Sequence, residues 1–468
     1  MARAPLALQD YVDLERDRIV ATLFDWLRIP SISAQPDHAG DVRASAEFVA
    51  GRLTEAGFEH VQLLETAGPP AVYGDWLHAG DDAPTVLVYG HHDVQPVDPL
   101  ELWSSPPFVP VIVDGECRAR GAIDDKGQTL YELEAARGLL RRDGRLPVNL
   151  KFIVEGEEEV GSPNFEALLQ EERDRLSCDV LVVSDTGMWA ADVPSVCTGM
   201  RGLVAFDVDV RSGRIDLHSG SFGGAVANPA HLIARIVAGL HDADGRVAVP
   251  GFYDDVRPLT EAEESSLRLL PFDEDTWKAM AGVERLEGEA GRTTLERIWT
   301  RPTCDVVGIT VGYGGEGTKT IVPAHGNFKV TFRLVADQHP ANIAAAFETW
   351  LRDQVPHGIE LTVRPEGGGV APALTPVDHP AVAALSAAIE RVWGQPPLFT
   401  REGGSGPEEA LGRVLDAPVL YLGVALPDDR YHAPNERMVM TQFWRGLLAA
   451  GELLVELGAA GDKVRRHG

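Results

Sequence analysis

The sequence lacks the features that would place it in a membrane or outside the cell. None of its 468 residues belongs to an apolar run long enough to span a bilayer. The first twenty residues also lack the continuous apolar segment of a secretory signal peptide. Cysteine is scarce: the four residues, Cys117, Cys178, Cys197 and Cys304, are far apart and form no CxxC pair, which argues against a disulfide framework or a thiolate metal site. We therefore expect a cytoplasmic protein whose cysteines are reduced core residues.

Positive charge is scarce as well. There are 42 Lys and Arg residues against 71 Asp and Glu residues, so the formal net charge is -29, and no basic run of useful length occurs. Nucleic acids and anionic membranes both attract basic patches, so we expect neither as a partner. The acidity is sufficiently explained by solubility.

The length and the pattern of apolar residues favour an α/β protein of two domains. Short apolar runs that are typical of buried strands alternate with helical patterns over Leu8–Leu27, Gln128–Leu140 and Leu447–Leu457. The strand candidates are Thr85–Tyr89, Leu150–Val154, Val180–Val183 and Pro418–Leu422. This alternation predicts a catalytic domain with a mostly parallel sheet, made of residues 1–201 and 373–468.

The middle of the chain has a different pattern. Leu203–Val210 and Gly326–Leu334 alternate apolar and polar residues, as half-exposed strands do. Between them, Asn228 is the expected N-cap of a helix over Pro229–His241. We expect residues 202–372 to form an inserted α+β domain.

Each predicted buried strand is followed closely by side chains that can bind a metal. The sequences after the four strands contain His91 to Asp93, Glu157 to Glu159, Asp185, and Tyr431-His432. Ligands bind at the carboxyl ends of the strands in open α/β sheets, so these side chains are expected to converge on one crevice. His91 and Asp93 are two residues apart, so on an extended chain their side chains point to the same side. Asp93 can therefore accept a hydrogen bond from the ring of His91 and orient it.

Each motif by itself also has a simpler interpretation. His91 and Asp93 can be a surface pair in a loop, Asp124-Asp125 can be a helix N-cap, and the three glutamates can form a solvated turn. The stretch Gly312–Gly317 matches GxGxxG, but a strand-like run ended by a proline follows it instead of the helix that a dinucleotide site requires.

Together the motifs GHHDVQP, GAIDDKG, EGEEEVGS, VSDT and YHAPNE resemble the five signatures of the carnosinase-type metallopeptidases, in the order of that family and from His91 to Glu436. This family includes cytosolic non-specific dipeptidases, acetylornithine deacetylase and succinyl-diaminopimelate desuccinylase. The resemblance implies two divalent metal ions per subunit. It assigns His91, Asp124 and Asp185 to one ion and Asp124, Glu159 and His432 to the other, with Asp124 bridging.

The resemblance also implies the reaction chemistry. Glu158 is the general base, Asp93 orients His91, and Glu157 has no role; the Asp124–Asp125 peptide bond is cis in relatives. Three ligand carboxylates and a bridging hydroxide balance the four positive charges of two cations, which clamp the tetrahedral oxyanion. Imidazole and carboxylate ligands suit zinc, with manganese or cobalt as alternatives.

The resemblance extends to the inserted domain and to the loop of residues 401–405. By resemblance, His218 in DLHSGSFGG reaches the active site of the other subunit and polarises the scissile carbonyl, so the inserted domain is a lid and dimerisation domain of a homodimer. Arg333 and Thr320 match residues that contact the substrate in relatives. The arginine at this position binds the substrate carboxylate there. The loop around Ser405 resembles a Gly-rich substrate loop, in which Glu402 can hold a free α-amine.

The leading hypothesis is a dipeptidase that cleaves the amide bond of dipeptides or small amino-acid derivatives. Asp185 favours it, because Asp at this position accompanies dipeptidase activity in the family while Glu accompanies carboxypeptidases and deacylases. An N-acyl-amino-acid deacylase or a carboxypeptidase is the alternative within the family. A non-catalytic peptide-binding protein is the alternative from another class, but such a relative should have lost ligands or the base.

Overall fold

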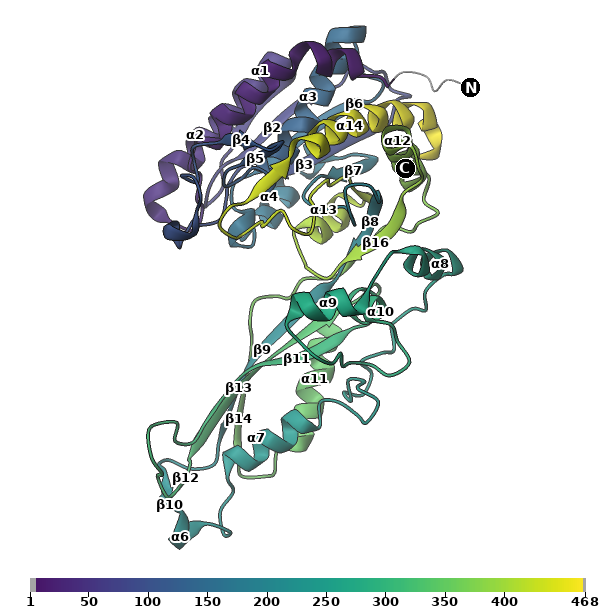
Figure 1. Ribbon diagram of the computed structural model, residues 1–468. Helices are drawn as coiled ribbons and strands as arrows, with labels where there is room; N and C mark the ends of the chain where they lie inside the picture. The colour runs from purple at the N-terminus through teal and green to yellow at the C-terminus, as the bar shows by residue number, and fades with distance from the viewer. Residues whose placement is uncertain (1–5, 466–468) are drawn as a thin grey trace. The chain divides into compact units, whose positions relative to one another are not determined.

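A computed structural model describes residues 6–465 of the chain (Figure 1). The described chain divides into two compact units: a first unit made of the described residues up to 198, residues 375–400 and the described residues from 406 on, and a second unit made of residues 199–374 and 401–405. The sequence had placed the domain borders near Gly202 and Pro372 and had assigned residues 401–405 to the first domain, whereas this short segment groups with the second unit. The roles of the units as catalytic and dimerisation domains stay predictions.

The first unit contains most of a nine-stranded mixed sheet. Its strand order is β1-β2-β6-β3-β7-β17-β8-β15, and β16 pairs with β8. The bounds are β1 Glu59–Leu64, β2 Ala71–Trp76, β3 Thr85–His91, β6 Asn149–Glu155, β7 Val180–Val183, β8 Ser195–Met200, β15 Ala373–Leu374, β16 Leu398–Glu402 and β17 Val419–Tyr421. The central strands β6, β3, β7 and β17 pair in parallel, and they are the four strands that the sequence predicted.

These central strands are mostly apolar because both faces of the sheet are covered. In β3, Val86 and Val88 belong to the large core that includes helices α3 and α14. Tyr89 points to the other face, where its ring packs against Phe165 of α4 at a centroid distance of 5.6 Å. The helices of this unit are α1 Gln9–Leu27, α2 Ala39–Ala56, α3 Lys126–Asp143, α4 Phe165–Glu171, α5 Arg173–Leu176, α12 Pro380–Trp393, α13 Glu408–Leu415 and α14 Met440–Ala460.

A small antiparallel sheet adds three short strands to the first unit. Its order is β18-β5-β4, with bounds β4 Val111–Val113, β5 Glu116–Arg118 and β18 Arg437–Val439. Four short 3-10 helices are also present in the described chain: η1 Pro36–His38, η2 Leu100–Leu102, η3 Glu158–Val160 and η4 Gly461–Lys463.

The second unit is an antiparallel sheet with helices on one face. Its strand order is β11-β13-β9-β14, with bounds β9 Gly202–Arg211, β11 Thr303–Val311, β13 His325–Leu334 and β14 Glu360–Pro365. Alternate residues such as Phe206 and Phe332 enter a core with α7 Pro229–Ala238 and α11 Pro340–Gln354. Asn228 caps α7 by accepting a hydrogen bond from the amide of Ala230, as the sequence predicted.

The remaining elements of the second unit are short. They are β10 Leu217–His218, β12 Ile321–Val322, α6 Ser219–Phe222, α8 Glu261–Leu269, α9 Glu274–Ala281 and α10 Thr294–Trp299. Helices α8 to α10 were not predicted, although Thr260 and Thr293 each begin a capping box. Within residues 6–465, no helix combines the length and the apolar character that a bilayer span requires.

Candidate metal centre

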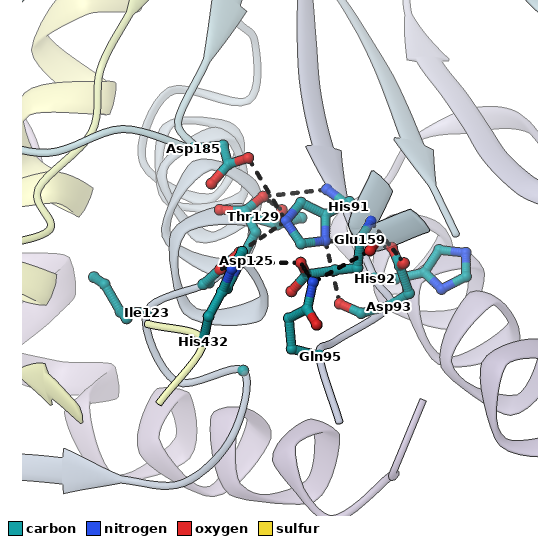
Figure 2. Close-up of polar contacts among 12 residues, drawn as sticks. His91, His92, Asp93, Gln95, Ile123, Asp125, Thr129, Glu159, Asp185 and His432 are labelled. Atoms are coloured by element: carbon teal, nitrogen blue, oxygen red, sulfur yellow. Dashed lines mark hydrogen bonds and ion pairs between the residues drawn. The ribbon is translucent and has the colours of Figure 1, made fainter. Parts of the chain in front are cut away.

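Strand ends bring the predicted metal ligands together in the first unit. His91 is the last residue of β3 and lies beside Glu155, the last residue of β6. Glu158 and Glu159 follow β6 on the 3-10 helix η3, and Asp185 follows β7 by two residues. Figure 2 shows His91, Glu159, Asp185 and His432 close together, although they come from separate parts of the chain.

The possible ligand atoms form two adjacent groups. His91, Glu158 and Asp185 offer atoms that all lie within 4.8 Å of one another, and so do Asp124, Glu159 and His432. Asp124 joins the groups. Its Oδ1 lies 3.0 Å from Nε2 of His91, and its Oδ2 lies 2.9 Å from Nε2 of His432. A carboxylate that faces one imidazole with each oxygen is placed as a bridging ligand would be.

His91 and His92 point in different directions (Figure 2). The Nδ1 atom of His91 lies 3.3 Å from Oδ1 of Asp93 and 3.1 Å from the carbonyl oxygen of the same residue. His92 instead contacts the carbonyl of Pro70 at 3.0 Å, and burial lowers its pKa to about 4. Asp93 also accepts a hydrogen bond from the amide of Glu159, so it ties the two strand ends together.

Asp125 is a supporting residue that the sequence suggested only as an N-cap. It precedes α3, but its side chain does not cap the helix. Its Oδ2 accepts hydrogen bonds from the amide of His91 at 3.1 Å and from the hydroxyl of Thr129 at 2.7 Å. The Asp124–Asp125 peptide bond is cis. Gly90 makes room for this contact, because a Cβ atom there would lie 2.1 Å from Oγ1 of Thr129.

Glu436 is a second supporting residue, and the sequence analysis gave it no role. It is fully buried, and its carboxylate accepts hydrogen bonds from the amides of Gly121, Ile123 and Asp124. Its Oε2 also lies 2.7 Å from Nη1 of Arg120, which is buried too. Since Glu436 stands four residues after His432, it connects the chain segments that carry Asp124 and His432. The only sequence signal was its position at the end of the YHAPNE motif.

A divalent cation fits the donor set. Oε2 of Glu159 accepts a hydrogen bond from Gln95 at 2.7 Å, whereas its buried Oε1 has no hydrogen-bond partner among the described residues. Buried carboxylate oxygens normally have a partner, and a metal ion would provide one here. Gln95 was also missed, because an isolated glutamine carries no recognisable pattern.

The electrostatics favour added positive charge as well. Burial raises the pKa of Asp185 to about 6, and Asp124 adds to this effect. Burial also raises the pKa of Glu158, with contributions from the charges of Asp185, Glu159 and Asp124. Cations in the centre would reverse these shifts, because they stabilise ionised carboxylates.

Glu157 and Glu158 differ sharply in their surroundings. Glu157 is buried and accepts hydrogen bonds from the amide and the side chain of Asn164, at 2.7 and 2.9 Å, so it fixes the start of α4. The carboxylate of Glu158 accepts no hydrogen bond from another described residue and remains available to a proton.

The other predicted site residues belong to the second unit and form two groups there. His218 is exposed and pairs with Ile321 where β10 meets β12. Thr320 precedes Ile321, and its carbonyl accepts a hydrogen bond from the amide of Ser219. Arg333 donates a hydrogen bond to the hydroxyl of Ser405 at 3.0 Å. Glu402 ends β16, and burial raises its pKa.

Comparisons with known proteins identify the family. The model of peptidase family M20/M25/M40 matches residues 87–456. The chain is 29% identical to human Beta-Ala-His dipeptidase, over 96% of this chain and 91% of that protein. It is 30% identical to the Cys-Gly metallodipeptidase dug1 of Schizosaccharomyces pombe, over 94% and 95% of the two chains. The crystal structure of an M20 family metallo-carboxypeptidase from Sulfolobus solfataricus superposes with a TM-score of 0.82 at 31% identity, over 94% of this chain and 99% of that one. The chain therefore belongs to peptidase family M20/M25/M40 and is an enzyme of the metallopeptidase class.

Proposed function

We propose that the protein is a cytoplasmic, homodimeric dipeptidase that uses two divalent metal ions to hydrolyse the amide bond of dipeptides or similar small amino-acid derivatives. The position of Asp124 between His91 and His432 is the observation that carries this proposal. It supports a centre for two ions, and two of the relatives described above are named as dipeptidases.

The chain offers a complete set of ligands for the two ions. His91 and Asp185 would hold the first ion, Glu159 and His432 the second, and Asp124 both. The carboxylate of Glu158 lies with the first group, so its distance alone does not separate a ligand from a base. We assign it as the base by its resemblance to the family, in which the second acid of the pair is the metal ligand; its carboxylate accepts no hydrogen bond from another described residue and is free to take a proton.

Bound cations supply Lewis acidity, which polarises the scissile carbonyl and makes water more acidic. Glu158 takes the proton of the attacking water and passes it to the amine that leaves. Asp93 keeps the ring of His91 in one orientation, and Asp125 and Glu436 hold the backbone around His91 and Asp124. The imidazole and carboxylate donors suit zinc, with manganese or cobalt as alternatives.

The second unit supplies the contacts that recognise the substrate. Arg333 binds the substrate carboxylate through its planar fork, and Thr320, Ser405 and Glu402 complete the recognition. His218 acts on the scissile carbonyl of the partner subunit, so each active site needs two chains.

A carboxypeptidase is the second candidate, since a metallo-carboxypeptidase of the family shares the fold at 31% identity. Dipeptides with a free amine and their N-acetyl or N-succinyl derivatives separate the candidates. The proposal expects metal-loaded enzyme to hydrolyse the free dipeptides, and hydrolysis of only the acylated compounds would refute it. Elemental analysis of the purified protein should find two divalent ions per chain.

Glu158→Gln tests the mechanism. Proton transfer by a positioned carboxylate contributes about 10²–10⁴-fold, so kcat should fall by that factor while the metal content stays at two ions per chain. Glu157→Gln is the matched control, because it alters the neighbouring acid, which fixes α4, and should keep most of the activity. Turnover of Glu158→Gln close to that of the wild type would remove the base from the mechanism.

A further inference from the structure

Two arginines of the second unit lack an acidic partner. Neither Arg201 nor Arg333 forms an ion pair with another described residue, and each guanidinium donates one hydrogen bond to a neutral oxygen. Arg201 donates through Nε to the carbonyl of Gly403 at 3.2 Å, and Arg333 donates through Nη1 to Oγ of Ser405 at 3.0 Å. Most of the donors of both guanidiniums are therefore left for a ligand.

Both arginines lie against the same loop, which contains Gly403 and Ser405. Arg333 pairs with Leu203 of β9, so the two side chains project in the same direction, opposite to the core residues Val204 and Phe332. Arg201 stands two residues before Leu203, just outside β9. The hydroxyl of Ser405 links the pair, because it accepts a hydrogen bond from Arg333 and donates one to the carbonyl of Arg201 at 2.6 Å.

The loop of residues 401–405 lies against the side chain of Arg201 and is held by an ion pair. A Cβ atom on Gly403 would lie 3.2 Å from Nη2 of Arg201, so a glycine lets the guanidinium lie against the loop backbone. The loop is held at its start, where buried Arg401 forms an ion pair with Glu263.

The charges in this site do not balance. Burial, followed by the positive charge of Arg333, lowers the pKa of Arg201 to about 10, and only Asp305 opposes this shift. Arg201 is still protonated at neutral pH, and Asp305 is exposed and forms no ion pair with it. Two half-buried positive charges without a carboxylate partner form an incomplete arrangement that a dianion would complete.

We propose that Arg201 and Arg333 together bind a substrate that carries two carboxylates, and that Arg201 determines the preference for the second one. This inference rests on the proposed dipeptidase function, because it names the substrate class of that reaction. If Arg333 holds the terminal carboxylate, the second carboxylate must lie close to it, because the two guanidiniums bond to Gly403 and Ser405, which are two residues apart in one loop. A C-terminal aspartate or glutamate meets this requirement. A dicarboxylic acyl group such as N-succinyl offers the same chemistry on the other side of the scissile bond.

The test compares acidic dipeptides with their uncharged isosteres. We expect metal-loaded wild-type enzyme to have a kcat/KM for Ala-Glu and Ala-Asp about 10–100-fold above that for Ala-Gln and Ala-Asn, because hydrogen bonds to a charged group contribute about 1.5–3 kcal/mol. Arg201→Gln should abolish this preference by lowering kcat/KM for Ala-Glu and Ala-Asp toward the values for Ala-Gln and Ala-Asn. Arg201→Lys should restore part of it, and Arg235→Gln, an exposed arginine on α7, should change nothing.

Binding separates this inference from the proposed function. In calorimetry, L-glutamate should bind the wild type about tenfold more tightly than L-glutamine, and Arg201→Gln should remove the difference even if no dipeptide is hydrolysed. If L-glutamate and L-glutamine bound the wild type with equal dissociation constants, this result alone would overturn the inference. A preference for N-succinyl-alanine over Ala-Glu that depends on Arg201 would overturn the assignment to the C-terminal residue. If Arg201→Gln lowered kcat/KM equally for all four dipeptides, Arg201 would have a structural role only, and the inference would be wrong.

Discussion

Glu436→Gln should show that the metal centre depends on a residue that touches no metal. Each oxygen of Glu436 accepts two hydrogen bonds: Oε1 from the amides of Ile123 and Asp124, and Oε2 from the amide of Gly121 and from Arg120. Burial raises the pKa of this carboxyl, but Arg120 and the amide donors favour its ionised form. The four donors therefore face four acceptor positions of a carboxylate.

The magnitude follows from this geometry. A glutamine keeps one acceptor oxygen and turns an NH2 group toward two of the four donors, so two hydrogen bonds to a charged group are lost, each contributing about 1.5–3 kcal/mol. The variant also leaves Arg120 buried without its counter-charge, and breaking such a pair costs about 3–5 kcal/mol. The two terms overlap, so we expect the free energy of unfolding to fall by about 3–5 kcal/mol.

The assay is urea unfolding of metal-free protein, together with metal affinity measured by competition with a chelator. Because the amides that Glu436 holds belong to the segment of Asp124, the affinity should also fall by about 10–100-fold. Glu157→Gln is the control: it alters another buried acid near the centre, one without an arginine partner, and should cost about 1–2 kcal/mol with unchanged metal affinity. If Glu436→Gln unfolds at the same urea concentration as the wild type and binds metal equally well, the reasoning is wrong.

Two further predictions concern the same unit. Gly90→Ala should lower the free energy of unfolding by about 1–3 kcal/mol and weaken metal binding, because the new methyl group meets Thr129 and Asp125; urea unfolding and chelator competition measure both effects. Gly40→Ala, in helix α2 with no atom near the new methyl, should instead stabilise the protein by up to about 1 kcal/mol, and equal effects of the two changes would contradict the argument. Burial raises the pKa of Glu132 from 4.5 to about 7, with Ser184 opposing the shift, so between these values the folded protein keeps a proton that the unfolded chain has lost. The free energy of unfolding should therefore fall by about 3 kcal/mol as the pH rises through this window. Glu132→Gln should remove that dependence and be the more stable protein at pH 8 in urea unfolding, and parallel pH profiles of variant and wild type would refute the assignment.

The parallel strands of the first unit could be predicted because they are buried on both faces. Thr85–Tyr89 and Val180–Val183 are apolar without interruption, which short strands in the middle of a covered sheet require. The convergence of His91, Glu159 and Asp185 followed from the same pattern, since parallel strands end at one edge. Helices α8 to α10 escaped prediction because they are short, and their clearest local signals are the capping boxes of α8 and α10 and the N-cap Asp273 of α9.

Other features of the site depend on contacts that join distant parts of the chain. Asp125 has the local pattern of an N-cap, but its carboxylate turns toward His91, 34 residues away. Glu436 reaches Ile123 across 313 residues, and Arg333 meets Ser405 across 72. No periodicity or spacing encodes such pairs, because each depends on which backbone amide or hydroxyl the fold brings to it.

The sequence by itself determined the alternating α/β architecture, the inserted second unit and the identity of the side chains that surround the metal centre, because burial and ligand chemistry are properties of residue types and their order. Only the tertiary structure decided that Asp124 faces both imidazoles, that Glu436 holds the backbone beneath Asp124, and that Arg201 lies beside Arg333 without an acidic partner. These arrangements are set by distances between segments far apart in the chain, and such distances exist only once the sheet and its loops have packed.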